Sequence, residues 1–125
     1  MLLDTCVLLW LAHDRTQISN KTLEKIDDSA VVFICAVSGF EIGLKFNAGK
    51  LRLPVPPLEW INGILKHHHI DVIDLDLEIC IKATALPPIH KDPCDRFIIA
   101  TALTREMPVV TADLRFAEYG VKVLI

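Results

Sequence analysis

The sequence predicts an α/β fold in three layers, with a central, mostly parallel sheet of four to five strands covered by helices on both faces. Short apolar runs of strand length alternate with segments of helical periodicity along the whole chain, which is the pattern of parallel sheets. The run at 31–35 is continuously apolar, as in a strand that is buried on both faces. The length of 125 residues is that of one ordinary domain, so we expect residues 1–125 to form a single domain.

Capping residues and breakers divide the chain into its expected elements. Asp92 before Pro93 indicates a helix start, because aspartate caps helices well and proline is tolerated in a first turn. In chain order we expect a strand at 1–3, helices at 7–12 and 19–26, a strand at 31–35, helices at 38–46 and 58–66, a strand at 72–75, helices at 77–86 and from Pro93, a strand at 109–111, a helical turn around Phe116 and Tyr119, and a last strand at 121–125.

Composition excludes several classes of protein. Hydrophobic residues make up 52% of the chain and charged residues 23%, which argues against disorder. The longest apolar runs are far shorter than the roughly 20 residues that cross a membrane, and the first residues lack the basic and apolar regions of a secretion signal. We therefore expect a cytoplasmic protein without a membrane partner. The net charge of −3 gives no general attraction to phosphate, so a nucleic-acid partner would need a local basic patch or metal ions.

The cysteines and the histidine run are given structural roles. The four cysteines lack the close spacing of a zinc site, so we expect reduced thiols, with Cys94 the most exposed of them. His67, His68 and His69 end a predicted helix, where cations suit the helix dipole, and we expect a solvated helix end there.

Four acidic residues are expected at one edge of the sheet. Asp4 and Asp113 each follow a predicted strand, and open parallel sheets bind ligands outside the carboxyl ends of their strands. Asp95 lies in the first turn of one predicted helix, and Glu41 opens another. Carboxylates at such short range repel one another, so a folded cluster needs cations, and oxygen ligands with open positions suit Mg²⁺ or Mn²⁺. Such ions activate water and neutralise a phosphodiester.

Some of these positions also have a structural explanation. Asp4 and Asp92 can each cap the helix that follows it. Ser38 and Glu41 have the spacing of a capping box, in which each side chain satisfies a backbone N–H at the helix start. On spacing alone we favour the capping box for Glu41 and the cap for Asp92.

Four motifs occur in order along the chain, and together they resemble those of one nuclease family. The motifs are Leu2-Leu3-Asp4-Thr5, Ser38-x-x-Glu41, His90-x-Asp92-Pro93-x-Asp95-Arg96-x-x-x-Ala100, and Thr111-x-Asp113 with Phe116 and Tyr119. Each motif is weak alone, but four at these separations are specific and span essentially the whole chain. They resemble the PIN-domain ribonucleases, and most of all the VapC-type toxins of bacterial toxin–antitoxin pairs.

The resemblance implies a PIN-like fold and a divalent-metal endoribonuclease that leaves a 5′ phosphate on cut RNA, acts as a homodimer and is silenced by a small antitoxin protein. It implies an acidic site for Mg²⁺ or Mn²⁺ made of Asp4, Glu41, Asp95 and Asp113, with Asp4 and Asp95 the main direct ligands. Thr5, Ser38 and Thr111 are implied to be polar neighbours that orient ligands or phosphate, and Asp92 is a further candidate. The chain departs from the family pattern at Cys6, where histidine is common, and at Cys94, where phenylalanine is common.

An acidic protein must still attract RNA. We hypothesise a basic margin around the site, although each of its members could equally be a solvated surface charge, and Arg96 could instead pair with a carboxylate. The margin is Lys45, Lys50, Arg52, Lys91, Arg96 and Arg115.

Other functions fit the residues less well. A phosphoryl-accepting receiver domain needs paired acids after its first strand, where only Asp4 stands, and a haloacid-dehalogenase-like phosphatase needs an acid at the position of Cys6. A catalytically silent PIN-like protein-binding module remains the alternative. Four uncompensated acids at one rim argue against it, because they cost stability that a pure binding module has no reason to bear.

Overall fold

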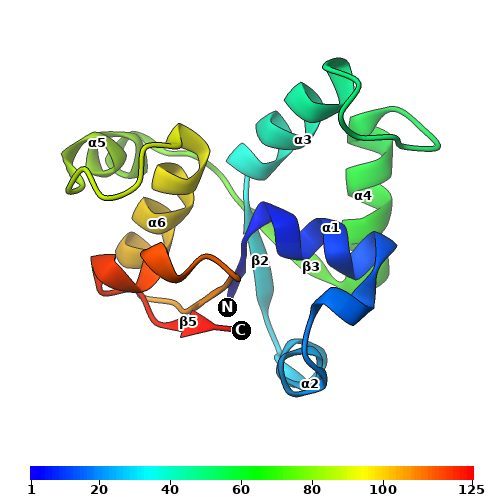
Figure 1. Cartoon of the computed structure of the whole chain (residues 1–125), viewed down its shortest axis with the longest axis horizontal. Coiled ribbons are helices and arrows are strands. Elements are labelled where there is room, and N and C mark those ends of the chain that lie inside the picture. The colour runs from blue at the N-terminus through cyan, green and yellow to red at the C-terminus, as the bar shows by residue number, and fades with distance from the viewer.

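Five parallel strands form one sheet in the order β3-β2-β1-β4-β5, and helices lie on both of its sides (Figure 1). The computed structural model describes residues 1–125. Its elements are β1 (Leu2–Leu3), α1 (Thr5–His13), the 3-10 helix η1 (Arg15–Gln17), α2 (Asn20–Asp28), β2 (Val32–Cys35), α3 (Val37–Asn47), α4 (Pro57–His68), β3 (Ile70–Ile73), α5 (Leu77–Ala85), α6 (Pro93–Arg105), β4 (Val109–Val110), the 3-10 helix η2 (Leu114–Tyr119) and β5 (Val123–Leu124).

The order of the strands creates one reversal point in the sheet. The chain passes from β1 to β2 and β3 in one direction, and then returns to place β4 on the other side of β1. Leu3 of β1 lies beside Ile34 on one side and beside Val110 on the other. Parallel sheets leave a crevice at the carboxyl ends of strands where the winding reverses. The residues that follow β1 and β4 are therefore placed at such a crevice by topology alone.

Side-chain alternation along the strands supplies two separate hydrophobic cores. Leu2 and Val109 point into the core under α5, α6 and η2, which lie together on one side in Figure 1. Leu3 and Val110 point into the core under α1, α2 and α4 on the other side. Strands that are buried on both faces must be apolar at every position, which explains the continuous apolar runs of the sequence. The predicted three-layer α/β fold with a parallel sheet is confirmed.

Two local predictions are wrong. The third strand begins at Ile70 and ends at Ile73, not at 72–75, because Ile70 pairs with Val32 and Ile73 with Cys35 over the full length of β2. All four cysteines are free, as expected, but Cys94 is buried while Cys6 is exposed. Cys94 lies one helical turn before the buried Ile98 and so faces the core. No helix combines the length and the apolar character that crossing a bilayer requires.

The packing of Phe116 gives a test of the fold beneath the crevice. This side chain is fully buried in η2, and its ring meets the His90 ring edge-on at a centroid distance of 5.9 Å. We expect Phe116→Ala to lower the free energy of unfolding by about 3–5 kcal/mol, because it leaves a cavity. Leu114→Ala in the same helix, where the side chain is 65% exposed, should change it by less than about 0.5 kcal/mol. Urea denaturation measures both, and equal losses would contradict this packing.

Candidate functional site

The predicted acids meet in one cavity at the crevice between the ends of β1 and β4. Asp4 comes from the end of β1, Glu41 from α3, Asp95 from the first turn of α6 and Asp113 from the segment after β4. The side chains that complete the lining are Cys6, Trp10, Asp92 and Ala112. Four elements that are distant in the sequence thus deliver carboxylates to one space.

Asp4 is buried and turned into the cavity. Its backbone N–H donates to the Val110 carbonyl at 3.0 Å, which ties the ends of β1 and β4 together. Asp4 stands at the N-cap position of α1, but its side chain accepts no capping hydrogen bond, so the capping role is wrong. Its Oδ2 instead accepts from Thr111 Oγ1 at 2.8 Å. Burial raises the pKa of the Asp4 carboxyl, and the Thr111 hydroxyl only partly opposes that shift.

Glu41 is free of the capping box that its spacing indicates. Helix α3 begins at Val37 with Ala36 as its N-cap, so Ser38 already lies inside the helix and cannot cap it. The Ser38 hydroxyl lies 2.8 Å from the Thr5 hydroxyl instead, in a fully buried contact between α3 and α1. Glu41 Oε1 is buried and has no hydrogen-bond partner, while Oε2 lies 3.4 Å from Lys45 Nζ. An unpaired buried oxygen is costly, and this one belongs to a residue that lines the cavity together with the other acids.

Asp92 and Asp95 take different roles at the start of α6. Asp92 Oδ1 accepts from the Cys94 backbone N–H at 2.9 Å, so its expected role as the helix cap is confirmed. Asp95 lies one residue after Cys94, and it forms part of the cavity lining. Burial, followed by the nearby charges of Asp4 and Asp92, raises the pKa of Asp95 to about 7. Where no added cation compensates its charge, the Asp95 carboxyl therefore holds a proton.

His90 belongs to the site, and sequence reasoning assigned it no role. The ring is 3% exposed, and its Nε2 lies 3.0 Å from Asp95 Oδ2 and 2.9 Å from Asp113 Oδ2. Its Nδ1 accepts from the Asp92 backbone N–H at 3.2 Å, so a neutral ring carries its proton on Nε2 and donates it to a carboxylate. The signal was a histidine two residues before Asp92 in the third motif. His90 lies in a loop, where no helical or strand periodicity indicates which way a side chain points.

Asp113 differs from the other three acids because cationic and N–H donors surround it. Arg115 donates from Nε to Oδ1 at 3.0 Å and from Nη2 to Oδ2 at 2.8 Å. These hydrogen bonds, with a further one from His90, hold the pKa of Asp113 well below its usual range. Ligand atoms of His90, Asp95 and Asp113 lie within 4.8 Å of one another, which is a spacing that could hold a metal ion.

Arg96 fastens the loop that carries His90. Tyr119 adds a second link, because its hydroxyl accepts from the His90 backbone N–H at 2.6 Å and donates to the Pro87 carbonyl at 2.8 Å. Arg96 forms no ion pair, so the hypothesis that it holds a carboxylate is wrong, and its guanidinium serves the backbone. Its four acceptors are the carbonyls of Ala83, Leu86, Pro87 and His90, at 2.8–3.0 Å.

The other basic candidates do not line the cavity. Lys45 pairs with Glu41, and Arg115 pairs with Asp113. Lys50, Arg52 and Lys91 are exposed and form no ion pair. The structure therefore keeps these three cations available at the surface.

Replacing Arg96 tests the link between this side chain and the His90 loop. Arg96→Lys keeps the charge but cannot reach four carbonyls from one ammonium group. We expect it to lower the free energy of unfolding by roughly 1–3 kcal/mol, because partly buried carbonyls lose their donors. Lys91→Gln, at an exposed and unpaired cation in the same loop, should change it by less than about 0.5 kcal/mol. Urea denaturation of both variants measures these changes. An Arg96→Lys protein with an unchanged free energy of unfolding would show that Arg96 does not hold the His90 loop.

The raised pKa of Asp95 predicts how stability depends on pH. The carboxyl has an ordinary pKa of 3.8 and a pKa of about 7 in the folded protein, so between these values the folded state keeps a proton that the unfolded state releases. Its contribution to stability is complete below the lower value and is lost as pH rises through the higher one. In EDTA, thermal melts should therefore show a melting temperature that falls from about pH 5 to about pH 7.5.

Asp95→Asn is the matched control, because the amide cannot ionise. The fall in melting temperature should become smaller in this variant, and the part that remains belongs to Asp4, whose pKa is also raised. Asp113 has the opposite effect on the pH dependence of stability. Because its pKa is lowered in the folded protein, it stabilises the folded state above its ordinary pKa of 3.8, and this contribution is lost only in acid. A slope that is identical in both proteins would contradict the raised pKa of Asp95.

Comparison with known proteins connects this geometry to a family. The family model for the PIN domain matches residues 1–122. The chain is 27% identical to Ribonuclease VapC22 of Mycobacterium tuberculosis (strain ATCC 25618 / H37Rv) over 120 residues, which are 95% of this chain and 91% of that protein.

Solved structures share the fold at low sequence identity. A chain of VapBC2 from Rickettsia felis, bound to a DNA fragment from its promoter, has a TM-score of 0.74 at 13% identity and covers 98% of this chain and 96% of that one. A chain of DNA-bound VapBC from Salmonella typhimurium has a TM-score of 0.71 at 21% identity, with coverages of 98% and 95%. Because the family model extends over nearly the whole chain, the protein belongs to the PIN domain family.

Proposed function

We propose that this protein is a divalent-metal-dependent endoribonuclease that hydrolyses RNA phosphodiester bonds and is the toxin of a toxin–antitoxin pair. The observation that carries the proposal is the group of Asp4, Glu41 and Asp95 around one cavity, where Asp4 is buried and Lys45 and His90 only partly compensate the other two acids. Its membership of the PIN domain family and its likeness to a protein named Ribonuclease VapC22 support the same activity.

The three carboxylates fit a hard cation. Glu41 Oε1 is buried without a partner, and the pKa values of Asp4 and Asp95 are raised, so added positive charge would relieve this part of the cavity. Carboxylate oxygens with open positions suit Mg²⁺ or Mn²⁺. We propose Asp4, Glu41 and Asp95 as the direct ligands. Asp113 would complete the site directly or through water, because Arg115 and His90 already compensate its charge.

The side chains around this site have separate tasks in the proposed reaction. A bound divalent cation supplies charge compensation and Lewis-acid polarisation of a phosphate. Thr111 fixes the Asp4 carboxylate, and the buried contact of Thr5 with Ser38 holds α1 against α3, so that Asp4 and Glu41 keep their separation. Asp113 stays ionised at neutral pH and can orient a water molecule by accepting its hydrogen bond. His90 keeps a proton on Nε2 between Asp95 and Asp113.

The proposed RNA partner would approach over the exposed cations. We keep Lys45, Lys50, Arg52, Lys91 and Arg115 as the basic margin and leave Arg96 out, because its guanidinium is committed to backbone carbonyls. In this proposal the protein acts on RNA in the cytoplasm. The acidic cavity repels the phosphates of RNA. In this proposal the metal ion and the basic margin together offset that repulsion.

Two helices offer apolar surface to protein partners. Phe40 and Leu44 lie one turn apart on α3 and are 62% and 51% exposed, and Leu77 and Ile81 lie one turn apart on α5 and are 78% and 62% exposed. Exposed apolar helix faces of this kind suit protein contacts. We propose a second copy of this chain and a small antitoxin as the partners. One of the similar structures is a toxin–antitoxin complex from Klebsiella pneumoniae, at 14% identity and a TM-score of 0.66.

The alternative is a catalytically silent PIN-like protein-binding module. Such a module would use the exposed helix faces and would leave the acids without a task. It offers no reason for a buried, unpartnered Glu41 oxygen, which costs stability. The nuclease proposal is therefore preferred.

An RNA cleavage assay tests the proposal. A structured RNA pool, incubated with the purified protein and Mg²⁺ or Mn²⁺, should be cut into fragments with 5′ phosphates, and EDTA should stop the reaction. Asp95→Asn should slow cleavage by about 100-fold or more, because it removes a proposed ligand. Asp74→Asn is the matched control, since Asp74 is an exposed acid directly after β3 and lies outside the cavity lining.

Two outcomes would contradict the proposal. Cleavage that survives in Asp95→Asn at the rate of the unsubstituted protein would show that the site is misplaced or that a contaminant cuts the RNA. No cleavage by the unsubstituted protein, under conditions where it is folded, would favour the binding module.

A further inference from the structure

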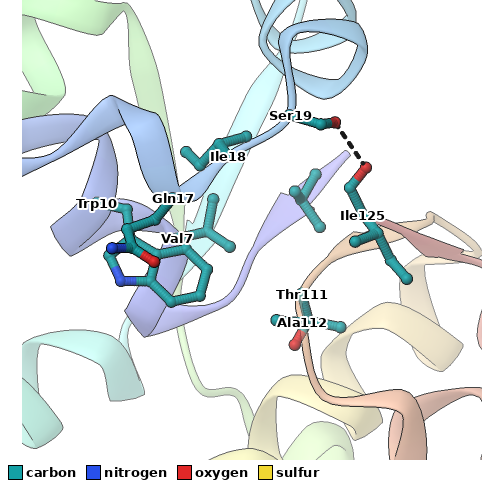
Figure 2. Close-up of a pocket in the computed structure, with 9 residues that line it drawn as sticks. Val7, Trp10, Gln17, Ile18, Ser19, Thr111, Ala112 and Ile125 are labelled. Atoms are coloured by element: carbon teal, nitrogen blue, oxygen red, sulfur yellow. Dashed lines mark hydrogen bonds between the residues drawn. The ribbon is translucent and has the colours of Figure 1, made fainter.

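A smaller, mostly apolar pocket adjoins the acidic cavity. Trp10 and Ala112 line both spaces, so the two share a wall there. Figure 2 shows Trp10 and Gln17 on one side of this pocket, with Thr111 and Ala112 on the other. The pocket is a small hollow of about 40 Å³. This size is far below the roughly 300–1,000 Å³ of sites for drug-sized ligands, so a flat ring can lie over it against Trp10, but a peptide segment cannot enter it.

The walls of this pocket combine a flat apolar surface with free polar groups. The Trp10 indole is half-buried, which anchors it and leaves part of the ring accessible. Ala112 is exposed, and its backbone N–H and carbonyl form no hydrogen bond within the chain. Gln17 donates its Nε2 to Asp14 at 3.2 Å and keeps its carbonyl oxygen free. Ser19 is already engaged, because its hydroxyl donates to the Ile125 carbonyl, the dashed contact in Figure 2.

We propose that this Trp10 pocket binds the base of the nucleotide next to the scissile phosphate, with the base stacked on the Trp10 indole. The inference rests on the proposed function, which places that phosphate in the acidic cavity across the shared wall. Proteins bind unpaired RNA bases by stacking them on aromatic rings and by hydrogen-bonding their edges. The indole supplies the first interaction, and the free groups of Ala112 and Gln17 supply the second. A base is uncharged, so the neighbouring carboxylates do not repel it as they would repel an acidic side chain.

The Trp10 pocket would give the reaction a preference at one position of the RNA. Stacking tolerates any base, whereas edge contacts to Ala112 and Gln17 discriminate among bases. Trp10 is thus a substrate-contacting residue that influences where the RNA is cut, and it has no part in holding the metal ion.

Tryptophan fluorescence tests base binding directly. The chain has two tryptophans, and Trp60 is 7% exposed and stacked on His13 at a centroid distance of 5.3 Å. Trp60→Phe therefore leaves Trp10 as the only indole and keeps an aromatic ring in the core beside His13. With Ca²⁺, which accepts oxygen ligands in looser geometry than Mg²⁺, short single-stranded RNA should quench this fluorescence to saturation. An abasic ribose-phosphate oligomer of the same length should quench it several-fold less. Equal quenching by both oligomers, or none by either, would overturn the proposal and leave the pocket to a protein partner.

Cleavage kinetics provide the second test. On an RNA that the unsubstituted protein cuts, Trp10→Ala should raise KM about tenfold and alter the base preference beside the cut, whereas Trp10→Phe should keep most of both. If Trp10→Ala does not fold, the fluorescence experiment decides alone. Cleavage with unchanged KM and unchanged cut sites in folded Trp10→Ala would refute the pocket and leave the nuclease proposal intact. Base-dependent quenching without any RNA cleavage would support the pocket and refute the nuclease proposal.

Discussion

Repulsion among carboxylates that the fold forces together is the constraint on which the site depends. The reversal of winding between β1 and β4 brings Asp4 and Asp113 to one crevice, and α3 and α6 add Glu41 and Asp95. The protein compensates Asp113 most fully, because Arg115 and His90 both hydrogen-bond it. Lys45 pairs with one oxygen of Glu41, and His90 Nε2 also lies 3.0 Å from Asp95. At the other end, burial is the main cause that raises the pKa values of Asp4 and Asp95. The charge of Glu41 adds to both shifts, and the charge of Asp4 adds to that of Asp95. This asymmetry gives the cavity one end that accepts positive charge and one that is already neutralised.

The cations of the chain explain why that charge must come from outside. Arg96, the guanidinium one residue after Asp95, donates to four backbone carbonyls and neutralises no acid. Its role is to hold the loop that presents His90, together with Tyr119. Lys45 reaches only one oxygen of Glu41 and leaves Oε1 unpartnered. A metal ion fits this arrangement better than any further side chain, because the nearby cations are already engaged.

The sequence predicted the fold and the four acids well because both follow from strand ends. Asp4 and Asp113 directly follow apolar runs, and the carboxyl ends of parallel strands share an edge. The sequence was a poor guide to the direction in which individual side chains point. Helix α3 begins at Val37, two residues earlier than the capping box requires, and that offset frees Glu41. His90 lies in a loop whose path is determined by tertiary contacts with Arg96 and Tyr119, and no local periodicity reports such contacts.

Anomalous X-ray scattering from crystals grown with Mn²⁺ tests the central claim most directly. A cation at the end of the cavity that the protein compensates least predicts an anomalous peak among the Asp4, Glu41 and Asp95 carboxylates. The peak should vanish in crystals of Glu41→Gln grown in the same way, or move away from that residue. A cavity without a peak at saturating Mn²⁺, with the Asp4, Glu41 and Asp95 carboxylates in the same positions, would contradict the account.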